Sequence, residues 1–433
     1  MISINININK ITSNPKIYNF CLISLISYFV LINYSYFAVG IISFLLIFGL
    51  ETKISNSSKF LYQGLVLSFY FKKFFIGYFQ NNLEVWESTF YSFYDAYLPD
   101  LHNLLQQFNC NYEALNFDSD CLVVPGYGPL VYLIKLQIDP DYFLKIYLVF
   151  LFALIIFLSI YAYKIFDEYS HLVTLALISP VVNFIIHQMN IDFIILLVAI
   201  IFLRKPENNI LITSLVLLVL SLIKIHPIAL IVSLIIIGYI KKNRNLILVN
   251  LGSLIAFTIY MILYFIRLNS FITSPRPSGL VNAVGLLTTS QYLWINFIKI
   301  TNQYRDVLII YFLIIILLLF FTFKIKNRKL IDTEISDFEF IFIIWILVNY
   351  LYANYDYRSV ILLPIFFTIL RRGLTSEAGI LLLFFIASPI NPAINSYLIN
   401  LLIIIKISIF FIIFFYISKK LYILFTEKLN EFS

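Results

Sequence analysis

Long apolar stretches separated by short polar turns recur along most of the chain, from Ile17 to Ser418. Each has about 15–22 residues, close to the length of a helix that crosses the hydrocarbon core of a bilayer. Roughly fourteen such stretches can be counted, at 17–34, 35–50, 60–79, 142–163, 171–187, 190–203, 209–223, 227–240, 246–266, 306–323, 338–352, 359–370, 375–388 and 396–418. Because a helix satisfies its own backbone groups, such segments suit lipid. The pattern predicts an all-α, polytopic transmembrane bundle of about 11–14 helices and excludes a soluble protein.

Two longer polar segments, 80–141 and 268–305, interrupt this pattern within what we expect to be one membrane domain, 1–433. The first contains LEVWESTFYSFYDAYLPDLHNLLQQF, where aromatic residues and leucines mix with acids at helical spacing. This spacing is typical of a helix that lies in the membrane interface. No lysine or arginine occurs between Phe74 and Ile134, whereas seven acids do: Glu84, Glu87, Asp95, Asp100, Glu113, Asp118 and Asp120.

Charge is scarce and unevenly placed. The chain is 61% hydrophobic and 12% charged, with a mean hydropathy of +0.93 and a formal charge of +7. Basic residues gather in alternate short turns, such as Arg204–Lys205 and Lys241–Arg244, which is the positive-inside pattern. It predicts cytoplasmic termini and outward-facing segments at 80–141 and 268–305. Nucleic acid is therefore not an expected partner, and membrane lipids are.

The three cysteines suggest no metal centre, because no CxxC or Cys/His spacing accompanies them. Cys21 lies in an apolar stretch and is expected to be buried. Cys110 and Cys121 lie in the first outward segment, where an oxidising compartment would allow a disulfide. The sequence leaves open whether Cys110 and Cys121 form a disulfide or remain two free thiols. No metal or cofactor is expected.

Five short signatures lie at predicted outer helix ends or in the outward segments. They are YDAY at 94–97, PGYGPL at 125–130, HQMNID at 187–192, SLIKIHP at 221–227 and NYDYR at 354–358. Ionisable groups at membrane depth are costly and usually face an interior or a wet cavity. Each signature also has a plainer interpretation: Lys224 can extend to the interface, and His226–Pro227 can mark only a helix break. Asp356 and Arg358 can form a local ion pair.

The order of these elements resembles glycosyltransferase family 87, the polyprenyl-phosphate-mannose-dependent transferases of the GT-C membrane fold. YDAY, YGPL, HQMN, LIKIHP and NYDYR correspond to its elements across about residues 90–365. His187 replaces the usual glycine before Gln188, and Gly128 interrupts the Tyr-Pro-Pro form of the turn. The resemblance implies a GT-C-like bundle in a bacterial inner membrane, with its active site on the periplasmic side.

The resemblance also implies a reaction and the residues that serve it. An acceptor hydroxyl of a lipid or glycan attacks a polyprenyl-phosphate-linked sugar, such as mannose or another hexose, with inversion. One carboxylate takes the proton and cations hold the departing phosphate. The phosphate candidates are Lys224, His226, Arg276 and Arg358, and the motifs add Tyr97, Gln188, Asn190 and Asp356 as substrate contacts.

Asp95 is the expected catalytic base. It lies early in the acidic segment among aromatic residues that can anchor it at the membrane surface, and YDAY is the best match to the family's catalytic aspartate. Glu87 and Asp100 are the alternatives.

Two other classes of function compete with the transferase. A transporter or flippase of lipid-linked saccharides would need a path across the membrane, usually with internal repeats and charges near the midplane. The ionisable residues instead gather at helix ends. A polysaccharide polymerase or ligase would use a large late outer segment, and 268–305 is modest in size.

Overall fold

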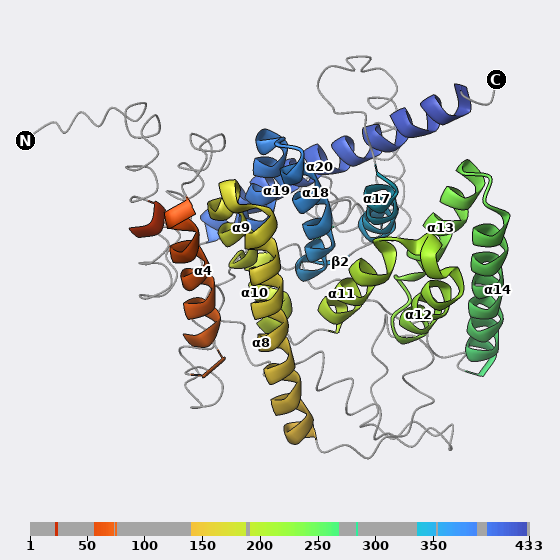
Figure 1. Cartoon of the computed structure of the whole chain (residues 1–433), viewed down its shortest axis with the longest axis horizontal. Helices are drawn as coiled ribbons and strands as arrows, with labels where there is room; N and C mark the ends of the chain where they lie inside the picture. Colours follow the sequence, from red (N-terminus) through yellow and green to blue (C-terminus); the bar gives the residue numbers. More distant parts are fainter. Residues whose placement is uncertain are drawn as a thin grey trace, which may run out of the picture. The chain divides into compact units, whose positions relative to one another are not determined.

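The structure is a computed structural model. It describes residues 22–24, 56–72, 74–75, 140–187, 191–267, 283–284, 336–351, 354–387 and 396–430. These residues are almost entirely helical (Figure 1). The only strand pairing among them is two residues long on each side. The predicted all-α class is confirmed for this part of the chain.

The chain divides into two compact units. The first contains 1–97, 144–187 and 366–409, and the second contains 98–143, 188–365 and 410–433. Helix α20 (Ser396–Asn430) contributes to both units, as do short ends of α8 and α18.

The first unit contains helices whose apolar residues pack against one another. They are α4 (Asn56–Phe71), α8 (Pro140–Ile165), the 3-10 turn η2 (Asp167–Tyr169), α9 (Ser170–Leu177), α10 (Pro180–His187), α18 (Leu363–Arg371) and α19 (Thr375–Ala387). The hydroxyl of Tyr70 donates to the carbonyl oxygen of Leu177 at 2.6 Å, which ties α4 to α9. Since both groups are buried, this bond satisfies polar atoms that water does not reach.

The prediction of one continuous helix over 171–187 was wrong. Helix α9 ends at Leu177, and α10 begins at Pro180. Proline has no N–H for the helix ladder and its ring clashes with the preceding turn, so it is favoured only in a first turn. The stretch is mainly apolar, with only isolated polar residues, and its high hydropathy hides the break.

The second unit contains the helices that carry the candidate site. They are α11 (Asp192–Leu203), η3 (Pro206–Asn209), α12 (Ile210–Ile223), α13 (Ile228–Ile240), α14 (Arg244–Arg267), α17 (Asp337–Leu351) and η6 (Asp356–Leu362). Helix α13 packs against α12, α14 and α17 (Figure 1). A Cβ added at Gly238 would lie 2.9 Å from Cγ1 of Ile247, so glycine permits the close approach of α13 and α14.

A short backbone ladder joins two distant segments of this unit. Strand β1 (Ala283–Val284) pairs antiparallel with β2 (Asn354–Tyr355), with Ala283 opposite Tyr355. The ladder connects the segment 268–305 to the residues that precede η6.

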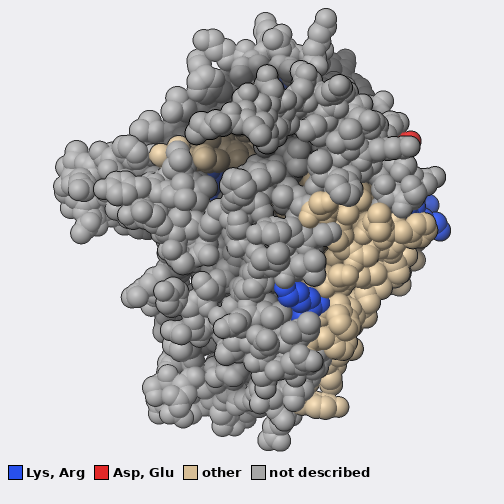
Figure 2. Space-filling view, turned by 90° about the vertical axis from the view of Figure 1, so that its left-hand side faces the viewer, with Lys and Arg blue, Asp and Glu red and all other residues tan. Residues whose placement is uncertain are grey.

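Three helices in the described part of the chain are long and apolar enough to cross a membrane: Ile146–Ile165, Pro206–Ile223 and Arg244–Leu263. Large apolar side chains on them are exposed, including Phe157, Leu211 and Leu263. On the face drawn in Figure 2, the described surface is largely uncharged, with only scattered charged groups. Because water disfavours so much exposed apolar surface, lipid is the environment that fits these helices.

Three charged residues connect η3, the end of α13 and the start of α17 at one end of the second unit. The ammonium of Lys241, which follows α13, contacts Glu207 of η3 at 2.7 Å and also Asp337, the first residue of α17. Burial lowers the pKa of Lys241, but hydrogen bonds and charge from Asp337 and Glu207 outweigh burial and raise that pKa above its ordinary value.

Candidate functional site

Three helix ends meet at the candidate site. Asp192 is the first residue of α11, Lys224 follows the last residue of α12, and His226 precedes Pro227, which caps α13. Proline disfavours helical backbone in the residue before it and removes an N–H donor. The helix therefore stops at Ile223, Lys224 adopts an extended conformation, and the predicted break at this proline is confirmed.

One carboxylate oxygen joins the three side chains. Oδ1 of Asp192 lies 3.1 Å from Nε2 of His226 and 3.8 Å from Nζ of Lys224. The side chains of Asp192 and Lys224 are buried, at 1% and 3% exposure, and that of His226 is 10% exposed. The contact with His226 is a hydrogen bond, whereas the longer contact with Lys224 is a looser ion pair.

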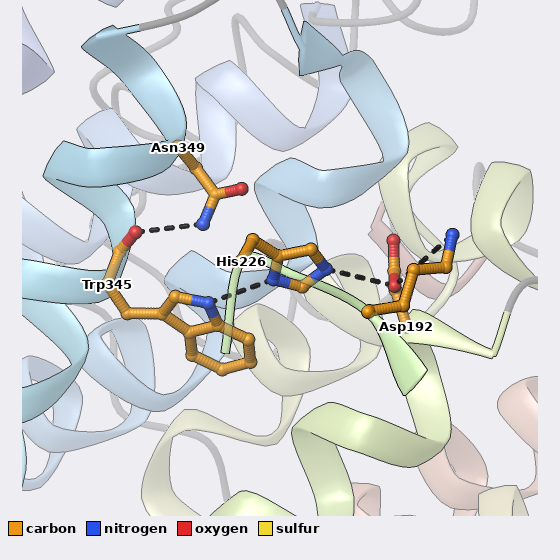
Figure 3. A network of polar contacts seen from close by, with 5 residues as sticks. Asp192, His226, Trp345 and Asn349 are labelled. Atoms are coloured by element: carbon orange, nitrogen blue, oxygen red, sulfur yellow. Dashed lines mark hydrogen bonds and ion pairs between the residues drawn. The ribbon is translucent and has the colours of Figure 1, made fainter. Parts of the chain in front are cut away.

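Trp345 of α17 extends the network on the other side of His226, as Figure 3 shows. Its indole Nε1 donates to Nδ1 of His226 at 3.0 Å, and the two rings are inclined by only 20°. Asn349, one turn further along α17, donates from Nδ2 to the carbonyl oxygen of Trp345 at 2.8 Å. The network therefore links α11, the break before α13, and α17.

A buried ion pair is costly to desolvate, and good local geometry must offset that cost. Asp192 lies in the first turn of α11, where the positive end of the helix dipole favours a carboxylate. Lys224 supplies a full opposite charge, and His226 supplies a hydrogen bond. Such clusters of buried ionisable groups occur at functional sites, although purely structural networks also contain them.

The cluster lies at the opposite helix ends from the basic turns. Helix α11 runs from Asp192 to the turn at Arg204–Lys205, and α13 runs from the break to the turn that begins at Lys241. Charged groups thus lie at both ends of the short helices, and their middles are apolar.

Part of the last sequence signature belongs to a 3-10 helix that contacts two helices of this network. Asp356 and Arg358 belong to η6, which packs against both α11 and α17. Their side chains lie outside the described part of the structure. The structure thus brings Lys224 and His226 together, and η6, which begins at Asp356, packs against the helices that hold their partners.

Five candidate residues lie outside the described residues. They are Asp95, Tyr97, Gln188, Asn190 and Arg276. The same holds for the predicted interfacial helix in 80–141 and for Cys110 and Cys121. Their assignments stay predictions.

Three residues of the network had no role assigned from the sequence: Asp192, Trp345 and Asn349. Asp192 is the last residue of the HQMNID signature, and eleven apolar residues follow it in α11. An acid at the start of so apolar a helix is a sign of a functional or paired carboxylate that can be recognised in the sequence. A tryptophan in an apolar stretch also signals a partner, because a buried indole N–H is usually hydrogen-bonded. Its partner, 119 positions away, could not be identified from one sequence.

Comparison with protein-family models, curated proteins and solved structures gives no match.

Proposed function

We propose that this protein is a membrane glycosyltransferase that moves a sugar from a polyprenyl-phosphate donor to a lipid or glycan acceptor. The motif order that resembles glycosyltransferase family 87 supports this proposal, as do the apolar helices of the described residues. In this proposal the chain is a polytopic GT-C-like bundle in a bacterial inner membrane.

The observation that carries the proposal is the buried cluster of Asp192, Lys224 and His226. A lipid-linked donor keeps its phosphate near the membrane surface, so its site needs a cation at the end of an apolar helix. Lys224 provides one, at the end of α12, with its ammonium 3.8 Å from the carboxylate of Asp192. In this proposal a phosphate oxygen of the donor shares that ammonium.

The reaction needs one proton acceptor and one anion site. The acceptor hydroxyl oxygen forms a bond to the anomeric carbon, and the bond from that carbon to the phosphate oxygen breaks. The bonding electrons leave with the polyprenyl phosphate, and the hydroxyl proton passes to the carboxylate of Asp95. Lys224, with Arg358 and Arg276, stabilises the charge that the phosphate gains.

The same helix ends support an active site on the outer face. Arg204, Lys205 and Lys241 lie at the ends of α11 and α13 away from the cluster. By the positive-inside rule we place these basic turns at the cytoplasmic face, and the cluster, at the opposite helix ends, on the side nearer the periplasm. A donor delivered on the periplasmic leaflet would enter there.

The test is an assay of the purified protein in liposomes with a panel of polyprenyl-phosphate hexoses and lipid acceptors. We expect a glycosylated acceptor and free polyprenyl phosphate in equal amounts, both measured by mass spectrometry, from at least one donor. A protein that consumes no donor in the panel, while a family 87 transferase in the same liposomes does, contradicts the proposal.

A transporter of lipid-linked saccharides is the second candidate, and one observation favours it. The α12–α13 break carries buried charges, as do the interrupted helices of many transporters. Movement of an intact lipid-linked sugar between leaflets, without any transferred product, would support this alternative.

A further inference from the structure

Both ring nitrogens of His226 are engaged by groups from different helices. Nε2 faces Oδ1 of Asp192 at 3.1 Å, and Nδ1 faces the indole nitrogen of Trp345 at 3.0 Å. Trp345 is fully buried, so its ring has a fixed place in the packing of α17. The two partners determine where the proton of His226 resides.

The chemistry of the indole fixes the tautomer. An indole nitrogen only donates, so Nδ1 of His226 must accept and carries no proton. The remaining proton of a neutral imidazole is then on Nε2, from which it donates to Asp192. A second proton on Nδ1 would place two N–H donors against each other at 3.0 Å and leave a buried indole without an acceptor.

We infer that Trp345 is a positioning residue that keeps His226 neutral, so that Lys224 remains the cation of this cluster that meets the phosphate. The phosphate part of this inference rests on the proposed function; the state of His226 rests on geometry alone. His226 was a sequence candidate for holding the phosphate as a cation. In this arrangement it instead holds Asp192, which in turn places Lys224.

The groups around His226 have opposite effects on the protonation of its ring. Asp192 of α11 favours a charged ring, while Lys224 at the end of α12 and burial in the cluster oppose one. Helix α17 presents Trp345 on this side, and its acids Asp337 and Glu339 lie at the other end of the helix. Helix α14 carries its arginines, Arg244 and Arg267, at its two ends, and η6 carries Asp356 and Arg358. A single substitution at Trp345 removes its contact with His226 without altering charge.

The first experiment measures the tautomer directly. Full-length protein with ¹⁵N-labelled histidine is studied by NMR, and the signal of His226 among the four histidines is assigned with His226→Gln. We expect His226 to remain a neutral Nε2–H imidazole from about pH 8 down to about pH 5.5, a range in which an ordinary histidine gains a proton. A wild-type His226 that titrates in this range, or that carries its proton on Nδ1, overturns the inference.

The second experiment removes the indole donor. In Trp345→Phe we expect His226 to gain a second proton as the pH falls, because Nδ1 no longer faces an N–H group. Phe342→Leu is the matched control, since this ring lies 5.7 Å from that of Trp345 in the same helix and makes no contact of this kind with His226. Titration of His226 in Phe342→Leu but not in Trp345→Phe overturns the inference.

The third experiment uses dihexyl phosphate, a diester monoanion that does not titrate in this range, as the probe of the anion site. Wild-type affinity should be nearly constant between about pH 5.5 and 8, whereas Trp345→Phe should bind several-fold more tightly at the lower pH, because its cluster gains a positive charge. If the tautomer is as expected and the probe does not bind, the phosphate role in the proposed function fails and the state of His226 stands. If the probe binds and wild-type affinity follows a titration of His226, the inference fails and the proposed function stands.

Discussion

Lys242 and Gly373 occupy the same position of the same helix-terminating motif in two different turns. Lys242 follows α13 with φ of 55°, and Gly373 follows α18 with φ of 75°. In each turn the N–H of this residue and of the next one bond back to the helix, at Tyr239 and Gly238 in the first case. This is the Schellman pattern, which favours glycine because a side chain strains left-handed backbone.

Gly373→Ala should destabilise the protein by about 1 kcal/mol. The nearest atom to an added Cβ, the hydroxyl of Tyr169, is 3.8 Å away, so there is room for the methyl group and the cost comes from the backbone angle alone. Thermal unfolding in detergent measures this loss of stability. Gly252→Ala, in the middle of α14 with open space around it, is the control and should not destabilise. Equal losses in the two variants would contradict the assignment.

Lys242→Gly should have the opposite effect and stabilise the protein by roughly 0.5–1 kcal/mol. Glycine adopts the positive φ of this turn without strain, whereas lysine does not. Lys242→Ala removes the same charge and keeps the strain, so it separates the two contributions. A midpoint for Lys242→Gly at or below that of Lys242→Ala would show that the turn is not strained.

The sequence predicted helices α12, α13 and α14 of the second unit to within a few residues. The stretches 209–223, 227–240 and 246–266 correspond to α12, α13 and α14. These segments are apolar over a helical length and end at lysine, arginine or proline, which are strong local signals. The break at Pro180 was missed, because the apolar residues continue across it and hydropathy carries no information on backbone N–H groups.

The candidate site was predicted in part, and the limit is physical. Lys224 and His226 were found because charge in an apolar chain is conspicuous. Asp192 lies 34 positions from His226, and Trp345 lies 119 positions from it. Such contacts depend on how helices pack, and no local pattern encodes them. The sequence therefore supplied the charged groups but not the proton arrangement among them.

Asp192→Asn should be strongly destabilising, by about 3 kcal/mol or more. It removes the negative charge that Lys224 faces and leaves a buried cation without it. The double variant Asp192→Asn/Lys224→Met should recover much of the loss, because an apolar side chain of similar length then replaces the buried ammonium. The unfolding midpoints of Asp192→Asn, Lys224→Met and the double variant give the coupling energy between the two side chains. Additive losses would mean that the two residues do not form an energetic pair.

The contacts of Lys241 should make a small, pH-dependent contribution to stability, of about 1 kcal/mol or less, because the three side chains are 40–46% exposed and water screens their charges. The pKa of Lys241 is raised in the folded protein, so the contribution is full below the ordinary lysine value and is lost as the pH rises through the raised pKa. Wild type and Lys241→Met are compared by thermal unfolding from about pH 8 to about pH 11. A difference in unfolding midpoint between wild type and Lys241→Met that grows as the pH rises would contradict this prediction.

Asp95→Asn should lower glycosyl transfer by about 10²-fold or more while donor binding persists, because the amide keeps the size of the side chain but cannot take a proton. Turnover in the donor assay and binding of the same donor give the two quantities. Glu113→Gln, another acid of the same segment, is the control. Near-normal turnover in Asp95→Asn would transfer the assignment to Glu87 or Asp100.

Helices α13 and α14 are joined by a three-residue turn and pack together, but they differ greatly in length. Thirteen residues of α13 rise about 20 Å, whereas twenty-four residues of α14 rise about 36 Å. Measured along the helices, α14 thus continues about 16 Å beyond the end of α13 where His226 and Lys224 lie. The end of α13 that carries the cluster therefore stops short of the far end of α14. In the proposed function, the tail of a lipid-linked donor would approach along the apolar length of α14 that α13 leaves uncovered.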